Sequence, residues 1–156
     1  MADWDIREDG RIIGVTEELS AQEIYEMGRK MEPFQIASAT RMGHIHLFVS
    51  DSRAASTFYQ KVLELADKFT VPSASWIASG DYHHHLAVNE WAGKHLDNRE
   101  AKLPGLAYYV VQVEKKEDLV AIAERANEQE VPVTWLTSSE LEFTDPDGIV
   151  TRVRKG

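Results

Sequence analysis

The order strand, helix, strand, strand, strand occurs twice along the chain, and this repeat constrains the fold more than any other feature. In the first unit, residues 43–49 alternate apolar and polar side chains, residues 51–64 carry an amphipathic helical stripe, and three short β-type segments follow. From residue 105 the same order begins again. We therefore predict an α+β fold in which two β-α-β-β-β modules, about residues 42–90 and 105–154, pair to form a concave mixed sheet.

Residues 1–41 differ in pattern and are predicted to form an N-terminal arm joined to a domain over residues 42–156. A turn signal at Asp9-Gly10 indicates a strand or hairpin, and Ser20 with Glu23 has the spacing of a helix capping box. The helix that follows carries one apolar stripe, formed by Ile24, Met27 and Met31. This stripe suggests that the helix covers part of the main domain.

Charge and composition restrict the partners. A chain of 156 residues is long enough for one well-packed domain. Its net charge of -9 argues against nucleic-acid binding, which needs clustered Lys and Arg. The absence of Cys leaves His, Asp and Glu as the available metal ligands. No apolar run approaches the roughly 20 residues that span a bilayer, so we expect no membrane partner and a cytoplasmic location.

Histidines are concentrated in the first unit. His44 and His46 share one face of the opening strand, opposite Ile45, Leu47 and Val49, and a triplet, residues 83–85, begins the fourth predicted strand. Strand alternation would send His83 and His85 to the face opposite His84, so that only one face of the triplet reaches a metal. Whether His84 or His85 faces inward stays open, because Leu86 and Val88 have the parity of His84 and equally mark a buried face.

Four segments, "MGHIHLFVSD", "FYQKVLEL", "DYHHHLAVNEW" and "FTDPDG", resemble in order and spacing the vicinal oxygen chelate superfamily of glyoxalases, bleomycin-resistance proteins and extradiol dioxygenases. The resemblance covers residues 42–153 and is strongest to the C-terminal half of catechol 2,3-dioxygenase-like proteins. Because the family's N-terminal half has no counterpart here, a homodimer that covers the surface left exposed is an expectation.

The resemblance implies a metal held by two histidines and a glutamate. Carried over, the first ligand is His44 and the second is His84, with His85 as the alternative. The third position departs from the family, because the residue there is Arg152. The family's catalytic Tyr falls on Glu142, and a further family His falls on Trp135.

The hairpin around "DPDG" can be derived from its apolar faces. Leu141 and Phe143 form one face of the incoming strand, and Thr151 and Val153 offer the matching face of the outgoing one. Aligning these faces requires a five-residue connection, residues 145–149. That connection sets Glu142 directly opposite Arg152, and both are predicted to point into the cavity.

Two functions from different classes follow. In the first, His44, His84 and a displaced carboxylate, Glu142, hold Fe(II) or Mn(II) in a metal-dependent extradiol dioxygenase-like protein that acts on a small aromatic or organic substrate. His46 is then the nearest acid or base, and Arg152 orients Glu142 or holds an anionic substrate.

In the second function, Arg152 occupies the place of the cation, and the chain is a metal-free small-molecule-binding protein of the bleomycin-resistance type. Its cavity is predicted to be lined by Phe48, Leu86, Tyr108 or Tyr109, and Trp135. A third option, glyoxalase-like isomerisation, would need further ligands at Ala107 and Arg152, where the chain has none.

Overall fold

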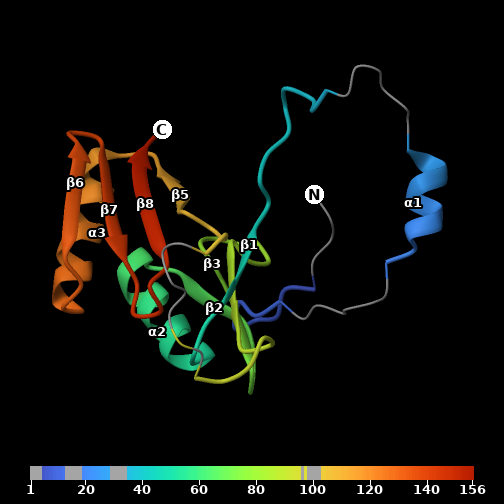
Figure 1. The fold of residues 1–156 in the computed structure, drawn as a ribbon, viewed down its shortest axis with the longest axis horizontal. Helices are drawn as coiled ribbons and strands as arrows, with labels where there is room; N and C mark the ends of the chain where they lie inside the picture. The colour runs from blue at the N-terminus through green and yellow to red at the C-terminus, as the bar shows by residue number, and fades with distance from the viewer. Residues whose placement is uncertain (1–4, 13–18, 29–34, 96, 98–102) are drawn as a thin grey trace.

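The computed structural model describes residues 5–12, 19–28, 35–95, 97 and 103–156. Its elements follow the predicted order and form two four-stranded sheets, each with one helix (Figure 1). The first module contains β1 (Ile45–Phe48), α2 (Ser52–Leu63), β2 (Ala66–Val71), β3 (Ala74–Ala78) and β4 (Leu86–Asn89). The second contains β5 (Tyr109–Val113), α3 (Lys116–Glu128), β6 (Val133–Thr137), β7 (Glu140–Thr144) and β8 (Val150–Lys155). The predicted α+β fold of two β-α-β-β-β modules is confirmed.

The two sheets have the same topology. Their strand orders are β1-β4-β3-β2 and β5-β8-β7-β6, with the first strand of each module parallel to its last and the other pairs antiparallel. α2 packs on the first sheet and α3 on the second, and the two helices also contact each other. Each sheet therefore has one face covered by a helix and one face that no helix of the described residues covers.

Cross-strand pairs at equivalent positions lie on the uncovered faces of the two sheets. In the first sheet, His46 pairs with Ala87, which pairs with Trp76. In the second sheet, Val110 pairs with Arg152, which pairs with Glu142. The predicted Glu142–Arg152 cross-strand pair is confirmed, and the connection between β7 and β8 spans residues 145–149 as derived from the apolar faces.

Local sequence signals account for α2. Asp51 caps it, because its side-chain oxygen accepts hydrogen bonds from the backbone amides of Arg53 and Ala54. The helix ends at Glu64, which adopts the left-handed conformation at φ 57°. The predicted apolar stripe is buried against the sheet and consists of Ala55, Phe58, Tyr59 and Val62.

One continuous apolar core joins the two modules. It contains side chains from both helices and both sheets, and the Phe58 ring meets the Phe143 ring at a centroid distance of 6.1 Å. A buried polar contact reinforces this junction, because the Tyr59 hydroxyl donates a 2.6 Å hydrogen bond to Asp145 Oδ2 in the turn between β7 and β8. Burial raises the pKa of the Asp145 carboxyl. The turn is thus tied to the helix of the other module.

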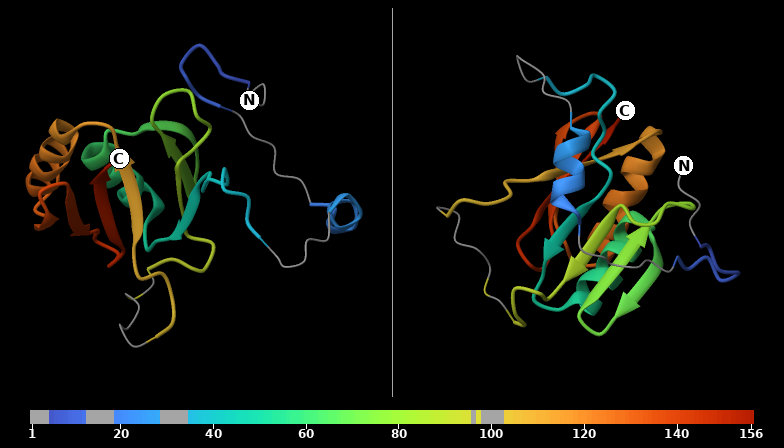
Figure 2. Two further views of the ribbon diagram at one scale, coloured as in Figure 1. Left: turned by 90° about the horizontal axis from the view of Figure 1, so that it is seen from above. Right: turned by 90° about the vertical axis from the view of Figure 1, so that its right-hand side faces the viewer.

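The N-terminal arm contains the predicted helix, α1 (Ala21–Met27), and the Ser20 hydroxyl accepts a 3.3 Å hydrogen bond from the Glu23 amide. The helix does not cover the domain as its apolar stripe suggested. None of its residues is buried, Ile24 and Met27 remain 51% and 85% exposed, and it lies apart from the sheets in Figure 1 and in the left view of Figure 2. The third residue of the predicted stripe, Met31, lies outside the described residues.

The first part of the arm does reach the domain. Ile6 and Ile12 form an antiparallel bridge, as the turn signal predicted, and the Ile12 amide donates a 3.0 Å hydrogen bond to the carbonyl of Lys68 in β2. Ile12 is only 4% exposed. In the part of the chain that the structure describes, no helix has the length and hydropathy of a membrane span.

Candidate metal centre

His44 and His46 enter the site from the start of the first sheet. His46 lies on β1, on the face opposite Leu47 and Val49, which are buried in the core. His44 precedes the strand by one residue and is exposed. Their ring centroids are 5.4 Å apart. The alternation predicted for this strand is therefore confirmed, and it directs both imidazoles away from α2.

The histidine triplet lies in the loop before β4 rather than in a strand. A turn at Gly80, where φ is 61°, leads the chain out of β3, and bends follow at His83 and His85. β4 begins only at Leu86. Because side chains alternate regularly only within a paired strand, the prediction that His83 and His84 point to opposite faces is wrong.

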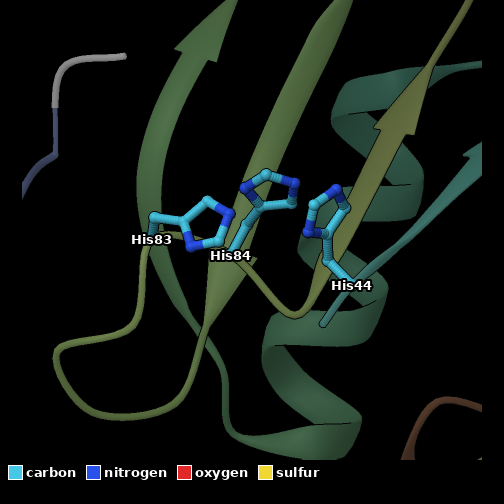
Figure 3. A group of neighbouring side chains, drawn as sticks. All are labelled: His44, His83 and His84. Carbon is cyan, nitrogen blue, oxygen red and sulfur yellow. The ribbon is translucent and has the colours of Figure 1, made fainter. Parts of the chain in front are cut away.

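Three imidazoles from these two segments converge. His44, His83 and His84 each offer a ring nitrogen, and the three atoms lie within 4.8 Å of one another (Figure 3). The His84 ring centroid is 4.2 Å from that of His44 and 4.2 Å from that of His83. His46 adjoins the group, since its Nε2 is 3.2 Å from Nε2 of His84. The imidazoles of β1 and of the triplet thus share one site.

The convergence resolves the choice left open between His84 and His85. His84 is buried, at 8% exposure, and lies at the centre of the cluster. His85 is exposed, its Nδ1 accepts a 3.2 Å hydrogen bond from the Ser79 amide, and its ring packs against Tyr82. His84, not His85, is therefore the triplet residue best placed beside His44.

Burial and mutual proximity lower the pKa values of His46, His83 and His84. Burial, followed by the neighbouring His83, lowers the pKa of His84 to about 3. Burial and His44 likewise lower the pKa values of His46 and His83. A neutral imidazole is the form that binds a metal, so the lowered pKa values of His83 and His84 favour their metal-binding form. The donor set fits a divalent metal ion.

Glu142 and Arg152 form an ion pair on the second sheet. Arg152 Nε donates a 2.7 Å hydrogen bond to Glu142 Oε2, and the Arg152 guanidinium carbon lies 3.7 Å from the centroid of the Tyr108 ring. The hydrogen bond to Glu142 raises the pKa of Arg152. Among the described residues, the group whose ligand atoms lie within reach of one ion comprises histidines and does not include Glu142.

Leu86 and Trp135 were both predicted to line the cavity. Leu86 was expected to line a cavity, but it is 3% exposed and belongs to the apolar core, because its strand parity follows Val88 and Leu47. Trp135 is 45% exposed on β6. A pocket of about 240 Å³ on the second sheet is lined by Pro132, Thr134, Glu142, Phe143 and Thr144, and Trp135 is not among these residues.

Sequence reasoning missed His83 as a member of the cluster. Its position shortly after the turn at Gly80 was the available signal, since a residue close to a turn need not obey strand alternation. Trp91 was also not among the predicted site residues. Its ring lies 6.1 Å from that of His46 and 6.3 Å from that of Trp76, so an aromatic surface adjoins the imidazoles.

The sequence matches the Glyoxalase/Bleomycin resistance protein/Dioxygenase superfamily over residues 41–153. It is 31% identical over 124 residues to the catechol-2,3-dioxygenase of Bacillus subtilis (strain 168). That match covers 78% of this chain and 44% of the relative, so the chain spans less than half the length of the curated relative that it matches.

Solved structures share the fold at lower identity. A glyoxylase/bleomycin resistance protein/dioxygenase domain from Frankia sp. EAN1pec is similar with a TM-score of 0.59 and 23% identity, covering 76% of this chain and 99% of that one. The fosfomycin resistance protein FosX of Listeria monocytogenes, in complex with Mn(II) and sulfate, gives a TM-score of 0.54 at 14% identity, covering 78% and 92%. At these identities the similarity shows the fold alone.

Proposed function

This chain belongs to the glyoxalase/bleomycin resistance protein/dioxygenase superfamily, and from that premise we propose that it is a metal-dependent, extradiol dioxygenase-like protein acting on a small aromatic substrate. One observation carries the proposal. The imidazoles of His44 and His84, which come from two different segments of the first module, have ring centroids 4.2 Å apart and offer nitrogens to a common ion. The 31% identity to a catechol-2,3-dioxygenase supports the reaction class.

Each predicted site residue has a defined role in the proposal. His44 and His84 hold the metal. The carboxylate that the sequence suggested as a third ligand, Glu142, is not in the group whose ligand atoms reach one ion. Iron(II) or manganese(II), when bound, supplies adjacent open positions for a catecholate and dioxygen. His46 is the nearest acid or base, and Arg152 orients Glu142 or meets an anionic group of the substrate.

The aromatic surface beside the cluster supports a planar substrate. The rings of Phe69 and Trp76 lie 5.3 Å apart, those of Trp76 and Trp91 lie 6.3 Å apart, and Trp91 adjoins His46 at 6.1 Å. Trp91 is 59% exposed, so its face is available to a ligand. Stacking on such rings favours an aromatic molecule and places it next to the imidazoles.

Oxygen consumption tests the function. The protein is loaded anaerobically with iron(II), catechol is added, and oxygen uptake is followed together with the absorbance of a ring-cleaved product. We expect His44→Ala to abolish uptake and to lower the bound iron, because it removes a ligand. His95→Gln is the control, since His95 is exposed and lies outside the cluster. Loss of uptake in both variants, or uptake unaffected by His44→Ala, would contradict the proposal.

A metal-free small-molecule-binding protein is the second candidate, and a specific observation favours it. Arg152 puts a guanidinium where the family resemblance calls for a metal-binding glutamate, and it is already paired with Glu142 at 2.7 Å. An organic anion could then bind at the second sheet. Elemental analysis separates the two candidates, because absence of metal after soaking with iron(II) supports the binder.

Self-association also stays a prediction. Phe48 and Trp91 are 60% and 59% exposed at the uncovered face of the first sheet and at its edge, so a second copy has apolar surface to cover. Light scattering over a range of protein concentrations tests it. A single monomeric mass at high concentration would rule the dimer out.

A further inference from the structure

We propose that this chain binds its metal with three imidazoles, those of His44, His83 and His84, all from the first module and with no carboxylate from the second. The inference rests on the metal-dependent function proposed above and corrects its third ligand. His83 would replace Glu142 in the ligand set. The site would then be complete within one module.

The backbone before β4 makes this ligand set available. Consecutive residues of a strand point to opposite faces, so His83 and His84 could not both bind one ion if the triplet were extended in the sheet. The bends at His83 and His85 remove that constraint. As a result the His83 ring lies 4.2 Å from that of His84 and 5.3 Å from that of His44, and all three side chains converge in Figure 3.

The distances are compatible with a single ion. Nitrogen ligands at about 2.1 Å from a metal are at most about 4.2 Å apart, when they lie on opposite sides of it. The three ligand atoms lie within 4.8 Å of one another. Nitrogens of a tetrahedral site are about 3.4 Å apart, so the largest gap needs to close by up to about 1.4 Å. His44 is exposed, so its side-chain torsions are free to bring its ring nitrogen towards the other two.

Glu142 is engaged in a way that disfavours its use as a ligand. Its Oε2 accepts the 2.7 Å hydrogen bond from Arg152 Nε, and its strand pairs directly with the strand that carries Arg152. A metal bound by Glu142 would lie beside a fixed guanidinium and would be repelled by it. The carboxylate is already neutralised by Arg152, whereas the imidazoles are neutral donors that can accept a cation.

The ligand chemistry has a measurable consequence. Three neutral nitrogen donors suit Zn(II), Co(II), Ni(II), Cu(II) and Fe(II), whereas carboxylate-poor sites hold Mn(II) weakly. His46 lies beside the set with its Nε2 3.2 Å from that of His84, which allows a hydrogen bond that orients the ligand. Addition of the metal ion should therefore shift the NMR signals of the ligand histidines and leave the Glu142–Arg152 ion pair intact.

Three matched variants of the full chain test the proposal through metal binding alone. Zn(II) affinity is measured by calorimetry for His83→Gln, His85→Gln and Glu142→Gln. We expect His83→Gln to weaken binding by more than about tenfold, because loss of a ligand exceeds the loss of a ligand's hydrogen-bond partner. His85→Gln is the control within the triplet and should leave the affinity unchanged, as should Glu142→Gln.

Nitrogen-15 NMR of the unmodified protein gives a second readout that does not depend on whether a variant folds. Of the six histidines, we expect His44, His83 and His84 to show the large nitrogen shifts of metal coordination on addition of Zn(II). Binding weakened more than about tenfold by Glu142→Gln, or an unshifted His83, would overturn the proposal. If Zn(II) binds as expected while the iron-loaded protein consumes no oxygen with catechol, the ligand set stands and the dioxygenase function fails.

Discussion

The hydrogen bond between Tyr59 and Asp145 allows a quantitative test of how the two modules are joined. Tyr59 is fully buried on α2, and its hydroxyl donates at 2.6 Å to a carboxyl oxygen that lies in the turn of the second module. Tyr59→Phe removes the donor and keeps the ring. A hydrogen bond to a charged partner contributes about 1.5–3 kcal/mol, so we expect the free energy of unfolding to fall by about 2 kcal/mol.

Urea denaturation followed by circular dichroism measures this loss. The slope of unfolding free energy against urea should not change, because both proteins expose the same surface on unfolding, and the midpoint should fall. A loss of about 2 kcal/mol corresponds to a decrease in Tm of about 4–8 °C for a chain of this length. Tyr25→Phe serves as the control, since Tyr25 is 73% exposed on α1 and should change neither value.

A double-mutant cycle assigns the effect to this contact. In an Asp145→Asn background the charged acceptor is absent, so Tyr59→Phe should cost less than it does in the unmodified protein. Asp145 Oδ1 also accepts a 2.7 Å hydrogen bond from the Ile149 amide, which Asn can retain through its carbonyl oxygen. An undiminished cost in that background, or a midpoint no lower than that of Tyr25→Phe, would refute the argument.

Two further predictions concern the shared core and alkaline pH. Phe143→Ala should lower the free energy of unfolding by about 3–5 kcal/mol in urea denaturation, because Phe143 is 2% exposed and packs against Phe58. Phe48→Ala is the control: Phe48 is 60% exposed, so its loss should lower the free energy of unfolding by less than about 0.5 kcal/mol. Equal effects of the two substitutions would contradict the core assignment. Burial raises the pKa of Tyr109 to about 12, so the unfolded chain loses its proton first and the free energy of unfolding should fall as pH rises from about 10 towards 12. Tyr109→Phe should make this decrease shallower, and an unchanged slope in pH-dependent denaturation would argue against the buried hydroxyl.

The parts of the fold that sequence alone could predict are those in which one face of a strand is buried. Leu141 and Phe143 had to match Thr151 and Val153, since slipping the register by one residue would move the apolar side chains to the other face. That constraint was enough to place Glu142 opposite Arg152. The convergence of His44 with the triplet was predictable for the same reason, because the repeat brings the first and last strands of a module together.

Alternation failed where the chain was not paired in a ladder. The rule placed His83 away from His84, yet the chain bends at His83 and β4 begins only at Leu86, so alternation does not hold across this pair. For α1 the periodic pattern identified the helix and its cap, but it carried no information about what the apolar side would contact. Local patterns predict which side chains share a face, whereas the neighbour of that face depends on contacts distant in sequence.

The placement of His83 and His84 ahead of β4, outside the paired ladder, has an evolutionary consequence. Neither side chain belongs to the apolar core, so substitutions at these two positions should leave the packing that maintains the sheet in place. If the proposed metal site is correct, its ligands can therefore change at a few loop positions while the framework is inherited unchanged.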